Sequence, residues 1–307
     1  MTQYQLTIIG DLNQDMLLQV PRFPMVDDEV EVLSVTRTAG GDAANIATAA
    51  ARLGCSPALI VCASADLEGR AMVEEVRKAG VNVEAVQWDA SLTNGFAIGL
   101  VRPDGQRNLL TYRGANQNLH LDERQKEIIA HSRIVHLSDP QPQILDEILT
   151  IVPPVFWLSF DPGGITANRS IEQLAPLLKR CRIFLSNAHE VSQLTAVADP
   201  IVAANQIRQL GPEIVVVKRG AKGCILITAT LQEKIAGFAV PAVDSTGAGD
   251  AFNAAFLTAM LEEIPLLEAA RFANAVGAIT TLKFGAQASL PTRQEVNEFI
   301  KANGKRI

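Results

Sequence analysis

Short apolar or β-branched runs alternate along this chain with longer segments whose apolar residues recur at helical spacing. The expected strands cover residues 5–9, 58–62, 134–137, 155–160, 183–185, 214–218 and 224–228. The expected helices cover residues 43–53, 69–78, 171–179, 202–210, 251–261, 266–282 and 293–302. Because strands that alternate with helices pair in parallel and are covered on both faces, the pattern predicts a doubly wound, mostly parallel α/β sheet.

Two regions interrupt this alternation with segments of two-residue period, which is typical of half-buried strands. The expected strand pairs are residues 15–20 with 29–38 and residues 93–101 with 107–112. The second pair surrounds Pro103-Asp104-Gly105, a good hairpin turn. A sheet this small has an apolar face to cover, so we expect a lid over a substrate cleft or against a partner subunit. Residues 1–307 are expected to form one domain, with the lid strands inserted at about 12–38 and 93–113.

The composition excludes several classes of partner. The 307 residues are 48% hydrophobic and 20% charged, which is typical of a packed enzyme rather than a disordered chain. The net charge is −6 and no block of Lys or Arg occurs, so nucleic acid is not an expected partner. Residues 1–10 have neither a basic start nor a long apolar run, so we expect no signal peptide and no membrane span.

The cysteines and histidines show no spacing that indicates disulfides or a metal site. Cys55, Cys62, Cys181 and Cys224 are scattered, as reduced core residues are in a chain of this size. The four histidines form no metal-ligand pattern. These observations favour a cytoplasmic location.

The segment from Val243 to Phe252 carries the strongest chemical signal, because it follows an apolar run and opens a helix with an apolar face. Gly247 and Gly249 allow a tight turn that presents backbone N–H groups outward. The first turn of a helix adds unpaired N–H groups and partial positive charge, which suits a phosphoryl group during its transfer. Asp250 lies at the same point and can accept the proton of an attacking hydroxyl.

Two other interpretations of this segment stay open at this stage. Asp250 can be only a favourable charge in the first helical turn, worth about 0.3–1 kcal/mol. Gly247-Ala248-Gly249 can also begin a dinucleotide-binding turn, although Phe252 or Asn253 occupies the third glycine position. A Walker A loop needs a Lys-Ser/Thr pair, and none follows.

Several motifs, in the same order along nearly the whole chain, resemble those of the ribokinase-like carbohydrate kinases, the PfkB family. Residues 244–252 resemble the second signature of this family, and residues 40–45 followed by 51–54 resemble the first. The other matches are a substrate motif at 10–15, Asn-x-x-Glu at 187–190, a nucleotide turn at 218–223, and a nucleotide wall and cation loop at 272–274 and 283–289. One such motif is weak, but six in register are strong.

The resemblance implies a substrate site. Its expected residues are Asn13, Asp15, Gly40, Gly41, Asn45, Arg113 and Asp250. The alternatives are a polar residue satisfied within its helix for Asn45 and an ordinary loop for the glycines. The charge of Asp42, at a position that varies in the family, could select a hydroxyl-rich edge or disfavour an anionic group.

Two further positions near the expected substrate stay open. Relatives that act on acidic keto-sugars hold a carboxylate with a Tyr/Arg group close to Tyr112-Arg113, and the alternative for Arg113 is a solvent-exposed arginine at a strand end. Some relatives bind the substrate with a carboxylate near this point of the chain. Either Ser138 or Asp139 corresponds to that position, because the alignment of the motif is open by one residue.

The resemblance also implies the catalytic and nucleotide-binding residues. Asp250 is the expected general base, with Gly247, Ala248 and Gly249 as the anion-binding backbone. The expected nucleotide-binding residues are Asn187, Lys218, Gly220, Gly223, Gly249 and Asn274.

Two cation sites are implied. Glu190 is expected to organise Mg²⁺ through water, but Asn187 and Glu190 also have the spacing of a helix N-cap with a capping box, and both roles can hold together. The residues that resemble a K⁺ site are Asp244, Thr246, Thr280, Lys283, Gly285 and Ser289. The alternative for this set is a loop packed beside the anion site.

The sequence therefore predicts a kinase that uses ATP and Mg²⁺ to phosphorylate a hydroxyl, usually a primary one in this family, of a small sugar or sugar derivative. K⁺ and a homodimer formed through the lid are open expectations. The alternatives are a nucleoside kinase of the same architecture, a non-catalytic sugar or nucleotide sensor and, more distantly, a dinucleotide oxidoreductase.

Overall fold

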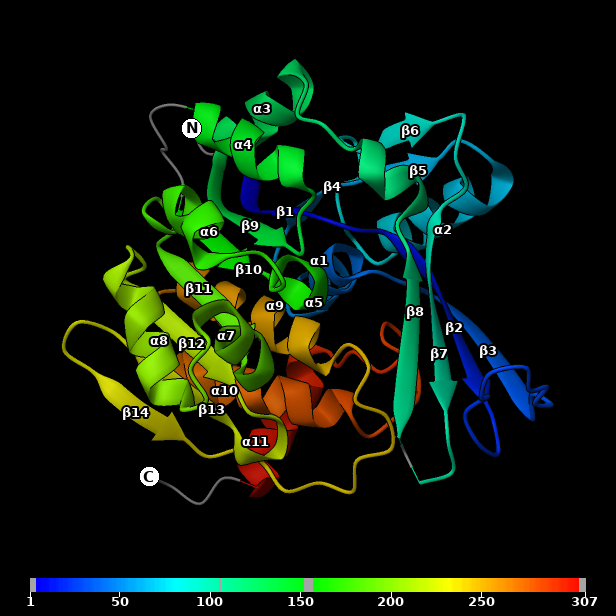
Figure 1. Cartoon of the computed structure of the whole chain (residues 1–307). Helices are drawn as coiled ribbons and strands as arrows, with labels where there is room; N and C mark the ends of the chain where they lie inside the picture. The colour runs from blue at the N-terminus through cyan, green and yellow to red at the C-terminus, as the bar shows by residue number, and fades with distance from the viewer. Residues whose placement is uncertain (1–3, 105, 152–156, 304–307) are drawn as a thin grey trace.

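The structure is a computed structural model that describes residues 4–104, 106–151 and 157–303 (Figure 1). The strands of its main sheet are β1 (Tyr4–Ile9), β4 (Pro57–Ile60), β9 (Ser132–Ser138), β10 (Trp157–Asp161), β11 (Ile183–Asn187), β12 (Ile214–Lys218), β13 (Cys224–Ile227) and β14 (Gln232–Ile235). Their order in the sheet is β14-β13-β12-β11-β10-β9-β1-β4. Neighbouring strands from β4 to β12 are parallel, and β13 and β14 add an antiparallel edge.

Helices cover both faces of the main sheet and bury one apolar core on each. One core contains residues of α1 (Asp42–Arg52), α2 (Leu67–Lys78), α9 (Ala248–Leu261), α10 (Leu266–Thr280) and α11 (Arg293–Asn303). The other contains residues of α3 (Glu123–Ala130), α4 (Pro142–Thr150), α6 (Ile171–Leu178), α7 (Ala188–Thr195) and α8 (Pro200–Gln209). Successive strand residues point to opposite cores, as Phe184 and Leu185 do in β11. The predicted doubly wound α/β class is confirmed.

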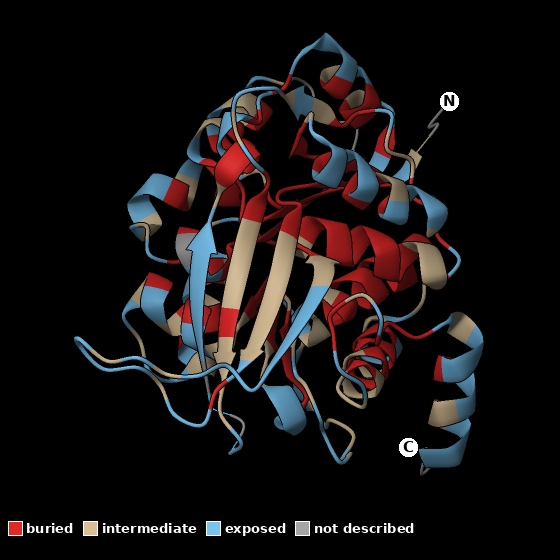
Figure 2. Cartoon of the chain, turned by 90° about the vertical axis from the view of Figure 1, so that its right-hand side faces the viewer, coloured by how far each residue is buried: buried red, intermediate tan, exposed pale blue. Residues whose placement is uncertain are grey.

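A second sheet, which we call the lid sheet, stands beside this body (Figure 1). Its strands, in spatial order, are β3 (Ser34–Gly40), β2 (Asn13–Gln19), β7 (Gly95–Val101) and β8 (Arg107–Tyr112). The strands β2 and β7 are parallel, while β3 and β8 pair antiparallel at the two edges. No helix or strand in the described part of the chain lies over one broad face of the lid sheet (Figure 2). The four predicted lid strands are therefore present.

Some predicted boundaries were wrong. Residues 29–33 are not a strand, because Asp27 has a left-handed backbone (φ 58°) and Asp28 pairs with Arg22 in a local turn. The expected strand at 58–62 divides into β4 and β5 (Cys62–Ser64), and β5 pairs instead with β6 (Gln87–Asp89). Gly105 and the beginning of the expected strand at 155–160 lie outside the described residues.

Several short elements complete the chain. They are the 3₁₀ turns η1 (Gly114–Asn118) and η2 (Gly220–Lys222) and the short helix α5 (Gly163–Thr166). Among the helices that the structure describes, none combines the length and the apolar character needed to cross a membrane.

Candidate active site

The N-terminus of α9 forms the centre of the site. Gly247 is its N-cap and has a left-handed backbone (φ 75°), and a Cβ at this position would lie 3.0 Å from Ala286. The left-handed backbone favours glycine here, and any other residue would also have to displace Ala286. The rest of α9 is almost entirely buried, so the position of its first turn is fixed by the core. The N–H of Ala248 already donates to the carbonyl of Ser245 at 3.3 Å, so this predicted anion-binding amide has a protein acceptor.

Asp250, in the first turn of α9, contacts α1. The Nδ2 of Asn45 donates to the Oδ2 of Asp250 at 2.9 Å. Asn45 is 3% exposed, and its Oδ1 finds no hydrogen-bond partner within the described part of the chain. A buried acceptor without a partner is costly, which is a sign that a ligand supplies the donor. Asn45 is therefore not a polar residue satisfied within its helix.

Burial raises the pKa of Asp250 to about 7, although the hydrogen bond from Asn45 and the charge of Lys218 oppose the shift. Asp42, at the start of α1, lies one helical turn before Asn45 on the same face. The negative charge of Asp250, followed by burial, raises the pKa of Asp42 well above its ordinary value. The N-termini of α1 and α9 thus bring two carboxyl groups into one region.

The base of the lid sheet adds Asp15 and Asn13. A Cβ at Gly40 would lie 2.0 Å from the Oδ2 of Asp15, so a larger residue there would displace this carboxyl group. Burial and then the charges of Asp250 and Asp244 raise the pKa of Asp15 to about 7. The Oδ1 of Asn13 accepts a hydrogen bond from Asn116 at 2.9 Å. Asp15 therefore lies close to the first turn of α9, whereas the side chain of Asn13 contacts Asn116.

Gly41 joins the lid sheet to α1. It is the N-cap of α1 with φ 92°, and a Cβ there would lie 2.6 Å from the carbonyl oxygen of Asp11. Gly41 therefore needs both its left-handed backbone and its missing side chain, and an ordinary loop would need neither.

Arg113 is not the solvent-exposed strand-end arginine that the sequence left as one alternative. Its side chain is 19% exposed and pairs with Asp11 (3.4 Å) and Asp139 (3.2 Å). Burial raises the pKa of Asp11 to about 7, against the charge of Arg113. Asp139 rather than Ser138 meets Arg113, and its Oδ1 accepts from the N–H of Thr166. Which of the two positions meets the substrate stays a prediction.

Lys218, the last residue of β12, extends its side chain toward α9. Its ammonium donates to the Oδ2 of Asp161 (2.7 Å) and to the Oδ1 of Asn253 (3.1 Å). The Nδ2 of Asn253 donates to the same Asp161 oxygen at 2.6 Å. Sequence reasoning missed Asp161 and Asn253. The available signal was the position of Asp161 directly after an expected strand, because ligands bind at the carboxyl ends of parallel strands.

Asn187 and Glu190 form a capping box at the start of α7. The side chain of Asn187 accepts from the N–H of His189 and of Glu190, and both carboxylate oxygens of Glu190 accept from Asn187. Burial and the charge of Asp161 raise the pKa of Glu190 to about 7. The helix-start interpretation is confirmed, and the role toward Mg²⁺ stays a prediction.

The expected nucleotide turn contains glycines of two kinds. Gly220 has φ 55° and open space around it, whereas a Cβ at Gly223 (φ 79°) would lie 2.1 Å from the carbonyl oxygen of Ile235. The Nδ2 of Asn274 donates to the carbonyl oxygens of Ile235 and Ala236, each at 3.3 Å. Gly223 therefore leaves room for the end of β14, and Asn274 holds the chain there by hydrogen bonds.

The residues that resemble a K⁺ site form a compact loop contact beside α9. The carboxylate of Asp244 accepts from the N–H and hydroxyl of Thr246 and from the N–H of Gly285. The hydroxyls of the buried residues Thr280 and Ser289 donate to the carbonyl oxygens of Val276 and Ala286. Lys283 is exposed. The structure thus brings the 283–289 loop against Asp244, as either interpretation of this set requires.

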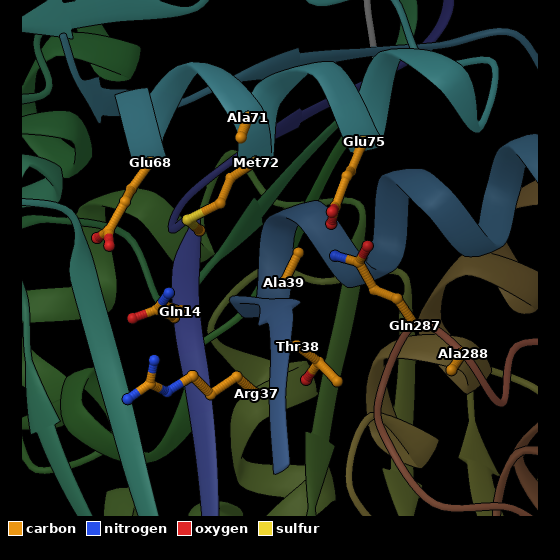
Figure 3. A pocket seen from close by; sticks show the side chains of 10 residues that line it. All are labelled: Gln14, Arg37, Thr38, Ala39, Glu68, Ala71, Met72, Glu75, Gln287 and Ala288. Atoms are coloured by element: carbon orange, nitrogen blue, oxygen red, sulfur yellow. The ribbon is translucent and has the colours of Figure 1, made fainter. Parts of the chain in front are cut away.

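A cavity of about 400 Å³ lies outside this group of residues. Its walls come from the lid sheet, α2 and the 283–289 loop (Figure 3). Gln14, which lines it, precedes Asp15 in β2 and therefore points to the opposite face of the lid sheet. Gln14, Gln287 and Ala288 belong to predicted motifs, but the residues that line the cavity are not those assigned individually to the substrate, nucleotide or cation sites.

Comparisons with known proteins agree with this geometry. A family model described as "pfkB family carbohydrate kinase" matches residues 3–293. A ribokinase of Haemophilus influenzae is 33% identical over 96% of this chain and 98% of its own. A nucleoside kinase of Methanothermobacter thermautotrophicus is 28% identical over 96% and 95% of the two chains.

A solved structure is similar over the same extent. The ribokinase of Arabidopsis thaliana, complexed with ribose and ATP, superposes with a TM-score of 0.86 at 27% identity, over 97% of this chain and 99% of its own. The chain therefore belongs to the pfkB family of carbohydrate kinases, which makes it a phosphotransferase that acts on an alcohol group of a sugar or nucleoside.

Proposed function

We propose that this enzyme transfers the terminal phosphoryl group of ATP to a hydroxyl of a small sugar, with Asp250 as general base. The observation that carries this proposal is the position of Asp250. Its carboxyl group lies in the first turn of α9 and is oriented by Asn45 at 2.9 Å. The ribose and ATP bound by the Arabidopsis thaliana ribokinase support the choice of substrates.

In the proposed reaction the acceptor oxygen attacks the terminal phosphorus as the bond to the bridging oxygen breaks, so that ADP leaves with the bonding electrons. The acceptor proton passes to the Oδ atoms of Asp250. Asn45 holds the carboxylate in place, and its buried Oδ1 is suited to accept from a sugar hydroxyl. Backbone N–H groups at the start of α9 stabilise the charge on the phosphoryl oxygens.

The described residues offer few direct ligands for Mg²⁺. Within the described residues no three His, Cys, Asp or Glu side chains are grouped as a metal site, and both oxygens of Glu190 accept from Asn187. Mg²⁺ keeps most of its water and binds mainly through nucleotide phosphates, so a sparse protein site suffices. Glu190 would hold it through water. When bound, Mg²⁺ would neutralise charge on the phosphates.

The experiment that tests Asp250 is the substitution Asp250→Asn, which keeps the shape of the side chain and removes its basicity. Turnover, measured as sugar-dependent ADP release, should fall by roughly 10²–10⁴-fold, the contribution of a general base, while sugar and ATP still bind in calorimetry. The matched control is Asp146→Asn, an exposed residue of α4, which should retain full activity. Wild-type turnover in Asp250→Asn would show that the base lies elsewhere.

A nucleoside is the second candidate acceptor, because a nucleoside kinase is among the relatives that match nearly the whole chain. A panel of ribose, fructose, keto-deoxy acids and nucleosides, each compared by kcat/KM for ADP release, decides between the two. A nucleoside preferred over every free sugar would replace the sugar in the proposal and leave the role of Asp250 intact.

We also propose a K⁺ site at the loop that Asp244 joins to Gly285. Asp244 fixes this loop against the turn that begins α9, so a cation bound there would order the anion-binding amides. Replacing K⁺ by tetramethylammonium should lower turnover, and Ser289→Ala should weaken the response to K⁺. Equal rates in the two salts would leave Asp244 with a structural role only.

We also propose that two copies of this chain assemble through their lid sheets. Val35, Leu110 and Tyr112 are 54%, 60% and 40% exposed, which is high for large apolar side chains. Their cross-strand register places them on one face together with half-buried Phe96 and Ile98. A second copy of this chain would cover that face.

A further inference from the structure

The sequence predicts Lys218 as part of the nucleotide turn, and in the structure its side chain extends to the first turn of α9. A Cβ built on Gly249 would be 3.6 Å from the ammonium nitrogen of Lys218. Gly249 immediately precedes Asp250 in the first turn of α9. The ammonium group therefore lies beside the backbone that is proposed to hold the phosphoryl group, and close to the general base.

The position of this ammonium group is fixed by two buried partners. Asp161 is 5% exposed and lies at the carboxyl end of β10, and Asn253 is fully buried one turn further along α9. The ammonium nitrogen is 2.7 Å from the carboxylate of Asp161 and 3.1 Å from the amide oxygen of Asn253. The Asn253 amide donates in turn to Asp161, which closes a three-membered network.

A donor count shows what this network leaves available. A lysine ammonium group has three N–H donors, and within the described part of the chain Lys218 uses two of them, on Asp161 and Asn253. The Lys218 side chain is 14% exposed, so it is not wholly enclosed by protein. One N–H thus remains for an acceptor from outside the chain.

The charges around Lys218 indicate the sign of that acceptor. Burial lowers the pKa of Lys218, but the charges of Asp161 and Glu190 more than reverse this effect, so the group stays protonated. The guanidinium of Arg113 is already paired with Asp11 and Asp139. Lys218 is therefore a cation beside the first turn of α9 that can offset negative charge arriving with a phosphoryl group.

We propose that Lys218 is a catalytic residue that donates a hydrogen bond to an oxygen of the phosphoryl group during its transfer, and that Asp161 and Asn253 are positioning residues that aim it. This inference rests on the proposed kinase function. Lys218 gives up no proton in the step: the acceptor proton goes to Asp250, and the electron pair of the broken bond leaves with ADP. The contribution of Lys218 is electrostatic and is greatest when the transferring group carries its full charge.

The test compares binding of the ground state with binding of a mimic of the transferring group. Calorimetry with Mg²⁺ and the acceptor sugar measures the affinity for ADP alone and for ADP with aluminium fluoride. In Lys218→Met we expect kcat and the affinity for ADP with aluminium fluoride to fall together by about 10²–10³-fold, the usual cost of removing one such donor. The affinity for ADP alone should be unchanged.

Other variants separate this role from a purely structural ion pair. Lys218→Arg should restore part of kcat, and Asp161→Asn should lower kcat with little change in the KM for ATP. Lys218→Met leaves the Asp161 charge buried without a partner, which can prevent folding. If Lys218→Met does not fold, the same measurements are made on the double variant Lys218→Met, Asp161→Asn, which removes both charges. Lys126→Met, in an exposed pair with Glu123, is the matched control.

Full kcat in Lys218→Met, or an equal loss of affinity for ADP and for ADP with aluminium fluoride, would overturn the inference. These outcomes differ from failure of the proposed function itself. If Asp250→Asn also kept full turnover, the whole site would be misassigned. If Asp250→Asn lost turnover while the Lys218 variants kept it, only the role of Lys218 would be wrong.

Discussion

At the scale of single residues, the site is crowded with carboxyl groups that do not titrate at their ordinary pH. Burial is the largest cause that raises the pKa of Asp11, Asp15, Glu190 and Asp250, each to about 7. A carboxylate with such a pKa is a much better proton acceptor than an exposed one, and near pH 7 it can both take up and release a proton.

The rate of the enzyme should therefore depend on pH around neutrality. Asp250 must be deprotonated to act as a base, and its pKa is raised to about 7, so kcat/KM should fall as the pH is lowered through about 7. The hydrogen bond from Asn45 lowers the pKa of Asp250, so Asn45→Ala should move the midpoint to higher pH. A pH–rate profile of both proteins tests this. A midpoint near 4 would mean that the base is exposed.

The sequence predicted some of these residues and missed others for a physical reason. Asp250 and Asn45 follow glycines at recognisable helix starts, so their positions could be read from local spacing. Asp161 and Asn253 both contact Lys218, and nothing in their local sequence shows which distant strand and helix will meet. The partners of Arg113 were unpredictable for the same reason, since Asp11 lies 102 residues away.

At the scale of secondary-structure elements, the antiparallel edge formed by β13 and β14 depends on one glycine. Gly223 and Gly220 both have left-handed backbones, but only Gly223 has another backbone where its Cβ would be. Gly223→Ala should therefore destabilise the protein by several kcal/mol, and Gly220→Ala by about 1–2 kcal/mol, the cost of the backbone conformation alone.

Urea unfolding of the two glycine variants provides the comparison. Gly220→Ala is the matched control, because it makes the same chemical change three residues away in open space. Equal losses in the two variants would show that the contact with Ile235 contributes nothing beyond backbone strain.

Long periodic elements were the predictable part of the fold. The expected helices at 43–53, 251–261 and 293–302 correspond to α1, α9 and α11 within a few residues, because each has a continuous apolar face. The helices α3 and α4 were not predicted. Residues 29–33 were wrongly assigned to a strand, since the side-chain pattern does not show the left-handed backbone at Asp27.

At the scale of the whole molecule, the uncovered face of the lid sheet is the surface through which we propose that a second copy of the chain binds (Figure 2). If a second copy covers this face, Leu110→Asp should convert a dimer into a monomer, because a charge would be buried without a partner at the interface. Light scattering coupled to size exclusion measures the mass. Val202→Asp, a similar change of an exposed residue on α8, is the control. A monomeric wild-type protein would contradict this part of the proposal.

The contact between Asn45 and Asp250 joins side chains 205 residues apart in the chain. Asn45 lies in α1, near the start of the chain, whereas the ribosome reaches Asp250 in α9 only after it has made four fifths of the protein. All four lid strands are thus synthesised long before Asp250, the proposed proton acceptor. During refolding, turnover should therefore recover no earlier than α9 packs against α1. An enzymatic assay then measures when this long-range contact forms.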